Sequence, residues 1–386
     1  MLNAITNSNF VKGIKKNPAY VRLRQQLPNG TATYRDDRGV FDIVDEVAFE
    51  WPDGVEKPRV AVIQDLESYP RWTKYLRFLE KNGFPCGIFD LHARNWLEEA
   101  SQYDVFMGLI GCDLATLIEQ RKKFFILEQY LGKICYPSTA HLMLYEDKTL
   151  EGYIAESAGF PLARTHISHQ KDDALAMIKT LSYPVISKFE TSSGSVGVQL
   201  VRNQRQAEKI VRQAFSIYGR ATHRLYQREK DVVFFQDFIP NDGYDIRCIL
   251  VDNMAFGYYR KVLKGDFRAS GMNQALWHDL PEETIRIAWQ MNQVIKSPIL
   301  VVDMVHGLDD KYYVIEYSIN CVIDTLEQLI VDETPGMYVI DPDGYIHFEA
   351  KRYWVHDLAL REFFYKDYLK GRLPQAVSPV TVQWTA

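Results

Sequence analysis

Two acidic residues in the last third of the chain each end a short apolar run. Asp303 follows the run at 299–302, and Glu316 follows the run at 313–315. If these runs are neighbouring buried strands, the two carboxylates offer hard oxygen ligands for Mg²⁺, which binds through a few carboxylates together with substrate phosphates. Strand-end acids that face solvent or pair with Lys or Arg explain the same pattern, and without further residues that interpretation is favoured.

A lysine followed by a loop of small residues is a second candidate site. Lys188 lies directly before the segment TSSGSVG at 191–197. Backbone N–H groups of such a loop can surround phosphate oxygens, and the adjacent ammonium group adds a compact positive charge. The spacing of a P-loop is missing. Because a Ser/Gly loop after a strand is more often a simple hairpin turn, this segment predicts a phosphate site only together with other residues.

Three arginines, Arg247, Arg260 and Arg268, lie between the loop and the two acids in the sequence. Each of them could form a surface ion pair, which is the ordinary role of an arginine. If they converge on one site instead, their guanidinium groups could neutralise a triphosphate and a developing acyl phosphate. The residues favour phosphate chemistry over nucleophilic catalysis, for which the chain shows no convincing Ser/His/Asp arrangement.

Hydrophobic periodicity predicts the elements that would position these residues. Between 58 and 136, strand-like apolar runs alternate with helical patterns, which predicts a parallel sheet covered on both faces. A helix is expected over 139–158, followed by a small α+β piece that carries the 191–197 loop. From Asp231 onward β-rich segments dominate, joined by Asp-containing turns.

Length and charge bound the class of protein. The chain has 386 residues, 45 Lys and Arg, 50 Asp and Glu, and a net charge of −5. At roughly 100–200 residues per domain this length predicts two or three domains. The small negative charge argues against a nucleic-acid partner held by a broad basic surface. No apolar run is long enough for a membrane span, and the N-terminal segment does not resemble a secretory signal, so a cytoplasmic protein is expected.

The cysteines carry no motif. They are widely spaced, odd in number and contain no C-x-x-C pair: Cys86, Cys112, Cys135, Cys248 and Cys321. This pattern disfavours a disulfide framework and a zinc site, and it is typical of isolated thiols in a reducing compartment.

Taken in order along the chain, the candidate residues resemble the motifs of the ATP-grasp superfamily. The resemblance covers about residues 140–330 and is greatest to the branch that holds the ribosomal-protein glutamate ligases and the D-alanine–D-alanine ligases. The motif residues are Lys148, Lys188 with the segment TSSGSVGV, Gln236 to Ile239, Asp245 to Arg247, Arg260, Phe267 with Arg268, Asp303 and Glu316. The preceding sheet resembles the family's pre-ATP-grasp domain in its architecture only.

The resemblance implies an α/β protein with the ATP-grasp fold. An N-terminal arm at 1–57 would precede a parallel-sheet pre-ATP-grasp domain at 58–138. A small α+β lid subdomain with its leading helix would follow at 139–235, and a β-rich catalytic subdomain at 236–340. Residues 341–386 would form a C-terminal extension that serves packing or an oligomer contact, such as that of a homodimer.

The resemblance also implies how ATP would be bound. Lys148 and Lys188 would contact the α- and β-phosphates from opposite sides, and the small-residue loop would close over the β- and γ-phosphates. The loop residues are Ser192, Ser193, Gly194, Ser195, Val196 and Gly197. The hinge would consist of Gln236, Asp237, Phe238 and Ile239. Backbone groups of Asp237 and Ile239 would bind the adenine edge, and either Asp242 or Asp245 would bind the ribose hydroxyls.

The remaining matches imply the chemistry. Arg260 would hold the transferred phosphoryl group, Arg247 and Arg268 would line the acyl-phosphate site, and Asp303 and Glu316 would bind Mg²⁺.

One position departs from the family pattern. The family usually reads Glu-x-Asn at its last metal ligands, but Ser318 stands where that asparagine is expected. Asn320 is then the alternative ligand, and a full two-metal site is in doubt.

The function implied is that of an ATP-dependent carboxylate–amine ligase. ATP would phosphorylate a substrate carboxylate, and an amine would attack the acyl phosphate, releasing ADP and phosphate. The segments DTLEQL and YWVHDLAL are similar to ATP-grasp proteins of surface-polysaccharide biosynthesis, which implies a uronic acid or sugar carboxylate and an amino acid as small-molecule substrates. Two other classes stay open: a kinase that phosphorylates a hydroxyl, and a nucleotide-binding regulatory protein without turnover.

Overall fold

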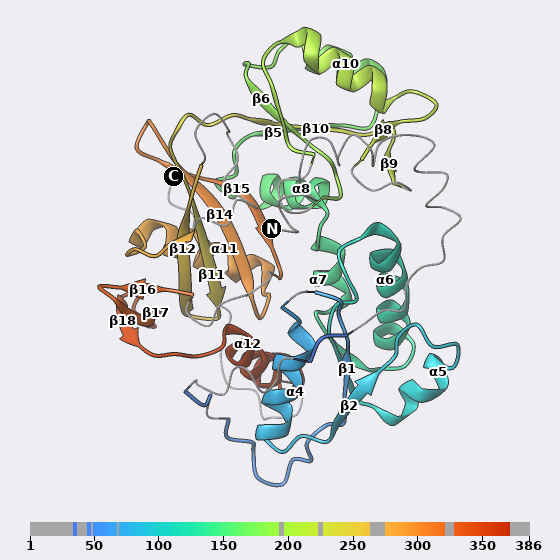
Figure 1. The fold of residues 1–386 in the computed structure, drawn as a ribbon, viewed down its shortest axis with the longest axis vertical. Helices are drawn as coiled ribbons and strands as arrows, with labels where there is room; N and C mark the ends of the chain where they lie inside the picture. The colour runs from blue at the N-terminus through green and yellow to red at the C-terminus, as the bar shows by residue number, and fades with distance from the viewer. Residues whose placement is uncertain are drawn as a thin grey trace, which may run out of the picture.

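The computed structural model describes the chain from residue 34 to residue 370 with gaps. The described residues are 34–36, 45–47, 49–67, 69–192, 197–222, 227–262, 275–320 and 328–370. Most of the expected N-terminal arm, Ser193 to Val196 of the loop, Arg268 and the end of the C-terminal extension lie outside them. In Figure 1 the first sheet and its helices lie at the lower right, the second sheet at the top and the third at the left.

The first sheet is parallel, as the alternating pattern predicts, with strand order β2-β1-β3-β4. Its inner strands β1 and β3 consist of buried residues only, because a parallel sheet is covered by helices on both faces. The elements are β1 (Val60–Ile63), α4 (Arg71–Lys81), β2 (Cys86–Phe89), α5 (Trp96–Glu99), a 3₁₀ turn (Ala100–Gln102), β3 (Val105–Met107), α6 (Leu114–Gln129) and β4 (Ile134–Tyr136).

The second sheet is antiparallel, with strand order β5-β10-β6-β7 and an apolar core of its own. Strand β10 inserts between β5 and β6, and it therefore spans the expected boundary between 235 and 236. The elements are β5 (Thr165–Ser168), α9 (Lys171–Met177), β6 (Val185–Lys188), β7 (Gln199–Val201), α10 (Gln204–Ala214), β8 (Arg220–Ala221), β9 (Arg228–Glu229) and β10 (Val233–Asp237).

The third sheet is the largest, with a path β15-β14-β11-β12-β17-β16 to which β13 and β18 are added. Its central strands pair antiparallel along nearly their whole length, so residues opposite each other in register meet on the same face. The elements are β11 (Asn241–Val251), β12 (Met254–Lys261), β13 (Ala275–Leu276), α11 (Glu282–Ile295), β14 (Leu300–Gly307), β15 (Tyr312–Ser318), β16 (Ile330–Val331), β17 (Thr334–Ile340) and β18 (Ile346–Ala350).

The single helix expected over 139–158 is two helices, α7 (Thr139–Leu144) and α8 (Lys148–Ala158). Between them Glu146 has a φ of 58°, which an α-helix does not allow. The side chain of Asp147 accepts a hydrogen bond from the backbone N–H of Leu150 at 3.0 Å and so caps the second helix. The break makes Lys148 the first residue of α8 rather than a residue within a longer helix.

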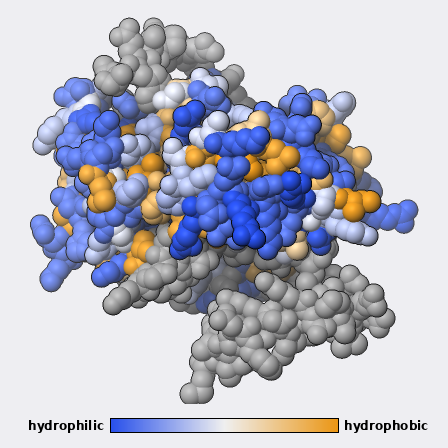
Figure 2. All heavy atoms as spheres, turned by 90° about the horizontal axis from the view of Figure 1, so that it is seen from above, coloured by the Kyte–Doolittle hydropathy of each residue, from blue (hydrophilic) through white to orange (hydrophobic). Residues whose placement is uncertain are grey.

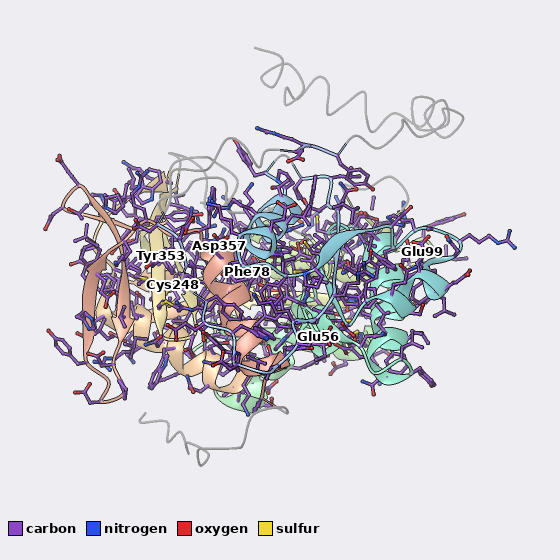
Figure 3. All side chains as sticks on the ribbon, turned by 90° about the horizontal axis from the view of Figure 1, so that it is seen from below. Glu56, Phe78, Glu99, Cys248, Tyr353 and Asp357 are labelled. Atoms are coloured by element: carbon purple, nitrogen blue, oxygen red, sulfur yellow. The ribbon has the colours of Figure 1, made fainter. Side chains whose placement is uncertain are left out.

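Two further helices differ from the sequence prediction. Helix α11 was not predicted, and it packs against β11 and β14. The sequence pattern also predicts a helix after His356 that ends at Arg372. The structure has α12 (Val355–Phe363), followed by a π-helical turn at Phe364–Tyr368, and Arg372 lies outside the described residues. Helix α12 packs against α4, as the labelled Asp357 and Phe78 show in Figure 3. One apolar core therefore runs through the first and third sheets.

The face of the molecule seen from above is mainly polar (Figure 2). Figure 2 shows hydrophilic residues over much of the face seen from above, with apolar residues in small groups between them. Within the described ranges, every helix is too short or too polar to span a bilayer.

Candidate functional site

Charged side chains from four neighbouring strands form a row across the third sheet. Arg260 in β12 is opposite Asp245 in β11, Arg247 in β11 is opposite Asp303 in β14, and Asp303 is opposite Glu316 in β15. Side chains two residues apart lie on the same face of a strand, so Asp245 and Arg247 both belong to this row. The register of the sheet thus brings together residues that are far apart in the sequence.

Ion pairs hold the row in place. Arg260 binds Asp245 through two contacts, Nε–Oδ1 at 2.5 Å and Nη2–Oδ2 at 2.8 Å. Arg247 binds Asp303 in the same bidentate way, with both contacts at 2.9 Å, and Nη2 of Arg260 lies 2.9 Å from Oδ2 of Asp303. Bidentate pairing orients the planar groups, so Asp303 is held between two guanidinium groups.

Two lysines from outside the third sheet complete the group. Nζ of Lys148 lies 2.9 Å from Oε1 of Glu316 and donates to the carbonyl of Ser192 at 2.8 Å. Lys188, the last residue of β6, donates to the carbonyl of Ile315 at 2.8 Å. The β14–β15 register skips Ile315. This bulge explains why a strand carbonyl is available to the lysine.

Four residues of the row and Lys188 form the charged end of a cleft between the second and third sheets. The cleft encloses about 730 Å³ out to its open mouth. Its charged end consists of Lys188, Asp245, Arg260, Asp303 and Glu316. Its apolar walls consist of Ile186, Val198, Phe238, Ile239, Val262, Val305 and Ile315. This combination suits a ligand with a flat apolar ring and an anionic tail.

The predicted hinge residues lie along the wall of this cleft. Nε2 of Gln236 donates to the carbonyl of Ala163 at 3.3 Å, and the Asp237 carboxylate lies 2.9 Å from Nε2 of His166. These contacts hold both side chains within the second sheet. Gln236, Asp237, Phe238 and Ile239 all line the cleft.

The two candidate aspartates for the ribose are placed differently. Asp245 lines the cleft, and its carboxylate is bound to Arg260. Asp242 is exposed, and its carboxylate lies 3.8 Å from Nδ1 of His306.

Opposite charges determine the ionisation of the carboxylates. Burial opposes ionisation of Asp303, but Arg247 and Arg260 outweigh it and hold the pKa of this carboxyl well below its usual range. Burial also opposes ionisation of Glu316, but the charges of Lys148 and Lys188 outweigh it and lower the pKa of this carboxyl. Both groups are therefore anionic at neutral pH. Burial lowers the pKa of Lys188 although the charge of Glu316 opposes this shift.

One acidic residue of the site is not among the residues predicted from the sequence. Glu151 is buried in α8, one helical turn after Lys148, and burial raises its pKa well above the usual range although Lys148 opposes the shift. Its signal in the sequence is an acid three residues after a lysine, a spacing that places both on one helical face. The carbonyl of the same residue accepts a hydrogen bond from the hydroxyl of Tyr317 at 2.7 Å.

The residues present fit a Mg²⁺ ion that also binds phosphate. In the described ranges, no cluster of three or more His, Cys, Asp or Glu side chains is preformed for a metal. Asp303 and Glu316, however, are ionised carboxylates directly opposite each other at the charged end of the cleft. Two carboxylates with substrate phosphates are a usual Mg²⁺ ligand set. The backbone N–H of Asn320 donates to the Ser318 hydroxyl at 3.3 Å, and its side chain lies beside Tyr145.

Comparison with known proteins identifies the type of domain. Residues 146–333 match the family model of the RimK-like ATP-grasp domain. The alpha-aminoadipate–LysW ligase LysX of Saccharolobus solfataricus is 26% identical over 198 residues, which is 50% of this chain and 68% of that protein. The probable alpha-L-glutamate ligase of Haemophilus influenzae is 24% identical over 190 residues, 47% of this chain and 58% of that protein.

A third relative shares a shorter segment. The carbamoyl phosphate synthase large chain of Pseudarthrobacter chlorophenolicus is 32% identical over 88 residues, which is 23% of this chain and 8% of that protein. The matches to these relatives thus range from a small part to about two thirds of their length.

Two solved structures are similar at low sequence identity. The D-alanine–D-alanine ligase of Bacillus anthracis has a TM-score of 0.49 at 17% identity, over 68% of this chain and 87% of that one. The RimK domain protein of Sphaerobacter thermophilus has a TM-score of 0.46 at 17% identity, over 67% of this chain and 90% of that one. On the match of residues 146–333 to the family model, this chain contains an ATP-grasp domain of the RimK-like family.

Proposed function

We propose that this protein is an ATP-dependent ligase that joins a carboxylate to an amine through an acyl phosphate. The observation that carries the proposal is the row Arg260, Asp245, Arg247, Asp303 and Glu316, with Lys188 beside it at the charged end of a cleft whose walls are apolar. The RimK-like domain supports it, as do the names of two relatives that are themselves ligases.

The apolar walls of the cleft would hold the adenine ring of ATP. Phe238 and Ile239 line this part of the cleft, and the backbone between Asp237 and Ile239 would bind the ring edge, since the Asp237 side chain is occupied by His166. The triphosphate would then extend toward Lys188 and the charged row. In this orientation the apolar ring is removed from water while the phosphates meet cationic groups.

Phosphoryl transfer needs positioning and charge neutralisation more than a protein nucleophile. Lys148 and Lys188 would bind the phosphates of ATP, and Arg247 and Arg260 would bind the acyl phosphate. Mg²⁺ held by Asp303 and Glu316 would neutralise further phosphate charge. Asp245 would orient Arg260 through its bidentate contact. Because these groups are held before the substrate arrives, little reorganisation is needed in the transition state.

A turnover assay tests the proposal. The protein is incubated with ATP, Mg²⁺, pooled amino acids and candidate carboxylates, including uronic acids, and the release of ADP and free phosphate is followed. ADP and phosphate in equal amounts, dependent on both substrates, support the ligase. ADP without free phosphate would indicate transfer to a hydroxyl. Nucleotide binding without turnover on any pool would indicate a regulatory protein.

A further inference from the structure

A buried guanidinium group without hydrogen bonds lies where the first sheet meets the third. Arg71, the first residue of α4, is 1% exposed. Within the described part of the chain, its Nε, Nη1 and Nη2 atoms have no hydrogen-bond partner. Oδ2 of Asp65 lies 3.7 Å from Nε, too far for a hydrogen bond, and it already accepts the backbone N–H groups of Arg71 and Trp72.

Such a group is costly to bury. An arginine side chain carries five N–H donors and stays protonated at any pH a protein survives. Buried donors are nearly always satisfied, and each exception needs an explanation. Because no described residue accepts a hydrogen bond from the guanidinium of Arg71, an acceptor would have to come from outside the described residues.

Polar groups of other elements lie close to Arg71, in addition to the carboxylates of Asp65 and Glu67. Burial raises the pKa of Tyr145, and Arg71 and the side chain of Asn320 both oppose this shift, which places all three groups together. Nδ2 of Asn320 is buried and, among the described residues, has no hydrogen-bond partner. His356 of α12 is neutral, because burial and the charges of Lys74 and Arg71 lower its pKa to about 3. Asp65 and Glu67 already act on the charge of Arg71, so what the site lacks is hydrogen-bond acceptors for the donors of Arg71 and Asn320.

A second buried group, the carboxyl of Glu146, interacts electrostatically with Lys148 and Glu316. Oε2 of Glu146 is buried and has no hydrogen-bond partner within the described ranges. Burial raises the pKa of Glu146 to about 7, Lys148 opposes this shift, and the charges of Glu316 and Glu67 add to it. The charge of Glu67 also acts on Arg71. With its φ of 58°, Glu146 has a backbone conformation that non-glycine residues mainly adopt where the surroundings impose it, often at functional sites.

We propose that these residues bind the amine substrate as a zwitterionic amino acid. Arg71 and Asn320 would bind its carboxylate, which offers two oxygens to the fork of donors, and Glu146 would bind its ammonium group on the side of Lys148 and Glu316. The assignment rests on the proposed function, because it places the amine beside the row that would hold the acyl phosphate. It adds a binding site formed by α4, the break between α7 and α8, and Asn320.

Calorimetric titration of the full chain tests the site. The first probes are the standard amino acids, each titrated with and without Mg²⁺ and a non-hydrolysable ATP analogue. For each amino acid that binds, the corresponding amine without the carboxylate is then titrated in the same way. The wild type is expected to bind an amino acid and to bind the matching amine about 100-fold more weakly. Arg71→Met is expected to lose this preference and to keep its nucleotide affinity.

Stability separates a binding role from a structural one. Replacing Arg71 by Met removes donors that have no hydrogen-bond partner, and Asp65 loses a charge 3.7 Å away but keeps its backbone hydrogen bonds, so the melting temperature should fall less than in the matched control. The matched control is Arg77→Met in the same helix. Nη2 of Arg77 lies 2.5 Å from Oδ2 of the buried Asp357, so this change should lower the melting temperature and leave amino-acid binding intact.

Three results would overturn the assignment. They are wild-type selectivity in Arg71→Met, a loss of stability in Arg71→Met as large as in Arg77→Met, and a wild type that binds nucleotide but none of the amino acids. Failure of the nucleotide to bind would instead contradict the proposed function. In that case the amino-acid titration without nucleotide still decides the assignment of Arg71.

Discussion

Nζ of Lys148 lies 2.9 Å from Oε1 of Glu316, an ion pair between residues 168 positions apart in the sequence. The lysine is 3% exposed and the carboxylate side chain is 36% exposed, so the pair is buried on one side and open to the cleft on the other. This contact joins the helix that precedes the second sheet to the strand that ends the charged row.

Two replacements of Glu316 distinguish its role in turnover from its role in stability. Glu316→Ala should abolish turnover and cost about 2 kcal/mol of stability, because it leaves the buried ammonium group of Lys148 without its carboxylate. Glu316→Gln keeps an oxygen acceptor for Lys148. It should also abolish turnover, but with a smaller loss of stability than Glu316→Ala. Chemical denaturation and ADP release measure the two effects. Normal turnover in Glu316→Gln would contradict the assignment of Glu316 to the metal.

Lys188 should contribute to nucleotide affinity through its charge. Lys188→Met keeps the apolar stem and removes the ammonium group at the charged end of the cleft. Because a hydrogen bond to a charged group contributes about 1.5–3 kcal/mol, we expect ATP to bind about 10- to 100-fold more weakly, as measured with a fluorescent ATP analogue.

The matched control for this change is Lys209→Met on the exposed face of α10, which should bind ATP like the wild type. Equal losses in both variants would mean that the effect is one of overall charge and not of the cleft.

Asp303 should determine how strongly ATP binding depends on Mg²⁺. Asp303→Asn removes one anionic ligand and releases the charges of Arg247 and Arg260, which now face each other across a neutral amide. We therefore expect ATP binding without Mg²⁺ to be retained or strengthened, while the gain in affinity on adding Mg²⁺ is lost. The measurement is ATP affinity as a function of Mg²⁺ concentration.

Asp309→Asn is the control for Asp303, because Asp309 lies in the exposed turn after β14 and accepts a hydrogen bond from the Tyr313 hydroxyl at 2.7 Å. It should keep the Mg²⁺ dependence of the wild type. If Asp303→Asn keeps this dependence as well, Asp303 is not a metal ligand.

His356 should make the protein less stable in acid. Burial and the charges of Lys74 and Arg71 lower its pKa from 6.5 to about 3. Between these values the unfolded chain takes up a proton that the folded chain does not, so the free energy of unfolding falls as the pH falls, by at most about 1.4 kcal/mol per pH unit.

His356→Phe removes this contribution while it keeps an aromatic ring against Tyr75, whose ring centre lies 5.7 Å from that of His356. Urea unfolding of both proteins from neutral pH to about pH 5 should show a smaller loss in the variant. The raised pKa of Asp357 has the opposite effect on stability, but it is common to both proteins and cancels in the comparison. Parallel pH profiles would show that His356 is protonated in the folded state.

Most of the fold could be predicted from the sequence where the pattern is local. Continuous apolar runs that alternate with helical stripes indicated the parallel sheet of β1 to β4, and Asp-containing turns indicated the hairpins of the third sheet. The spacing of apolar residues along an element depends on which of its faces are buried. Residues close together in the sequence are therefore enough to reveal it. The break at Glu146 was missed, because apolar residues on both sides of it continue the helical period.

The sequence by itself determined which residues could do chemistry and in what order they occur. Only the tertiary structure decided which of them meet. Strand register places Arg247 opposite Asp303 and Asp303 opposite Glu316, and chain folding brings Lys148 to Glu316. The burial of Arg71 without a hydrogen bond has no signal in the sequence at all. Contacts between distant residues and unsatisfied buried groups depend on long-range packing and on the electrostatics of the folded interior. The sequence pattern of a helix or strand reflects only which of its own faces is buried.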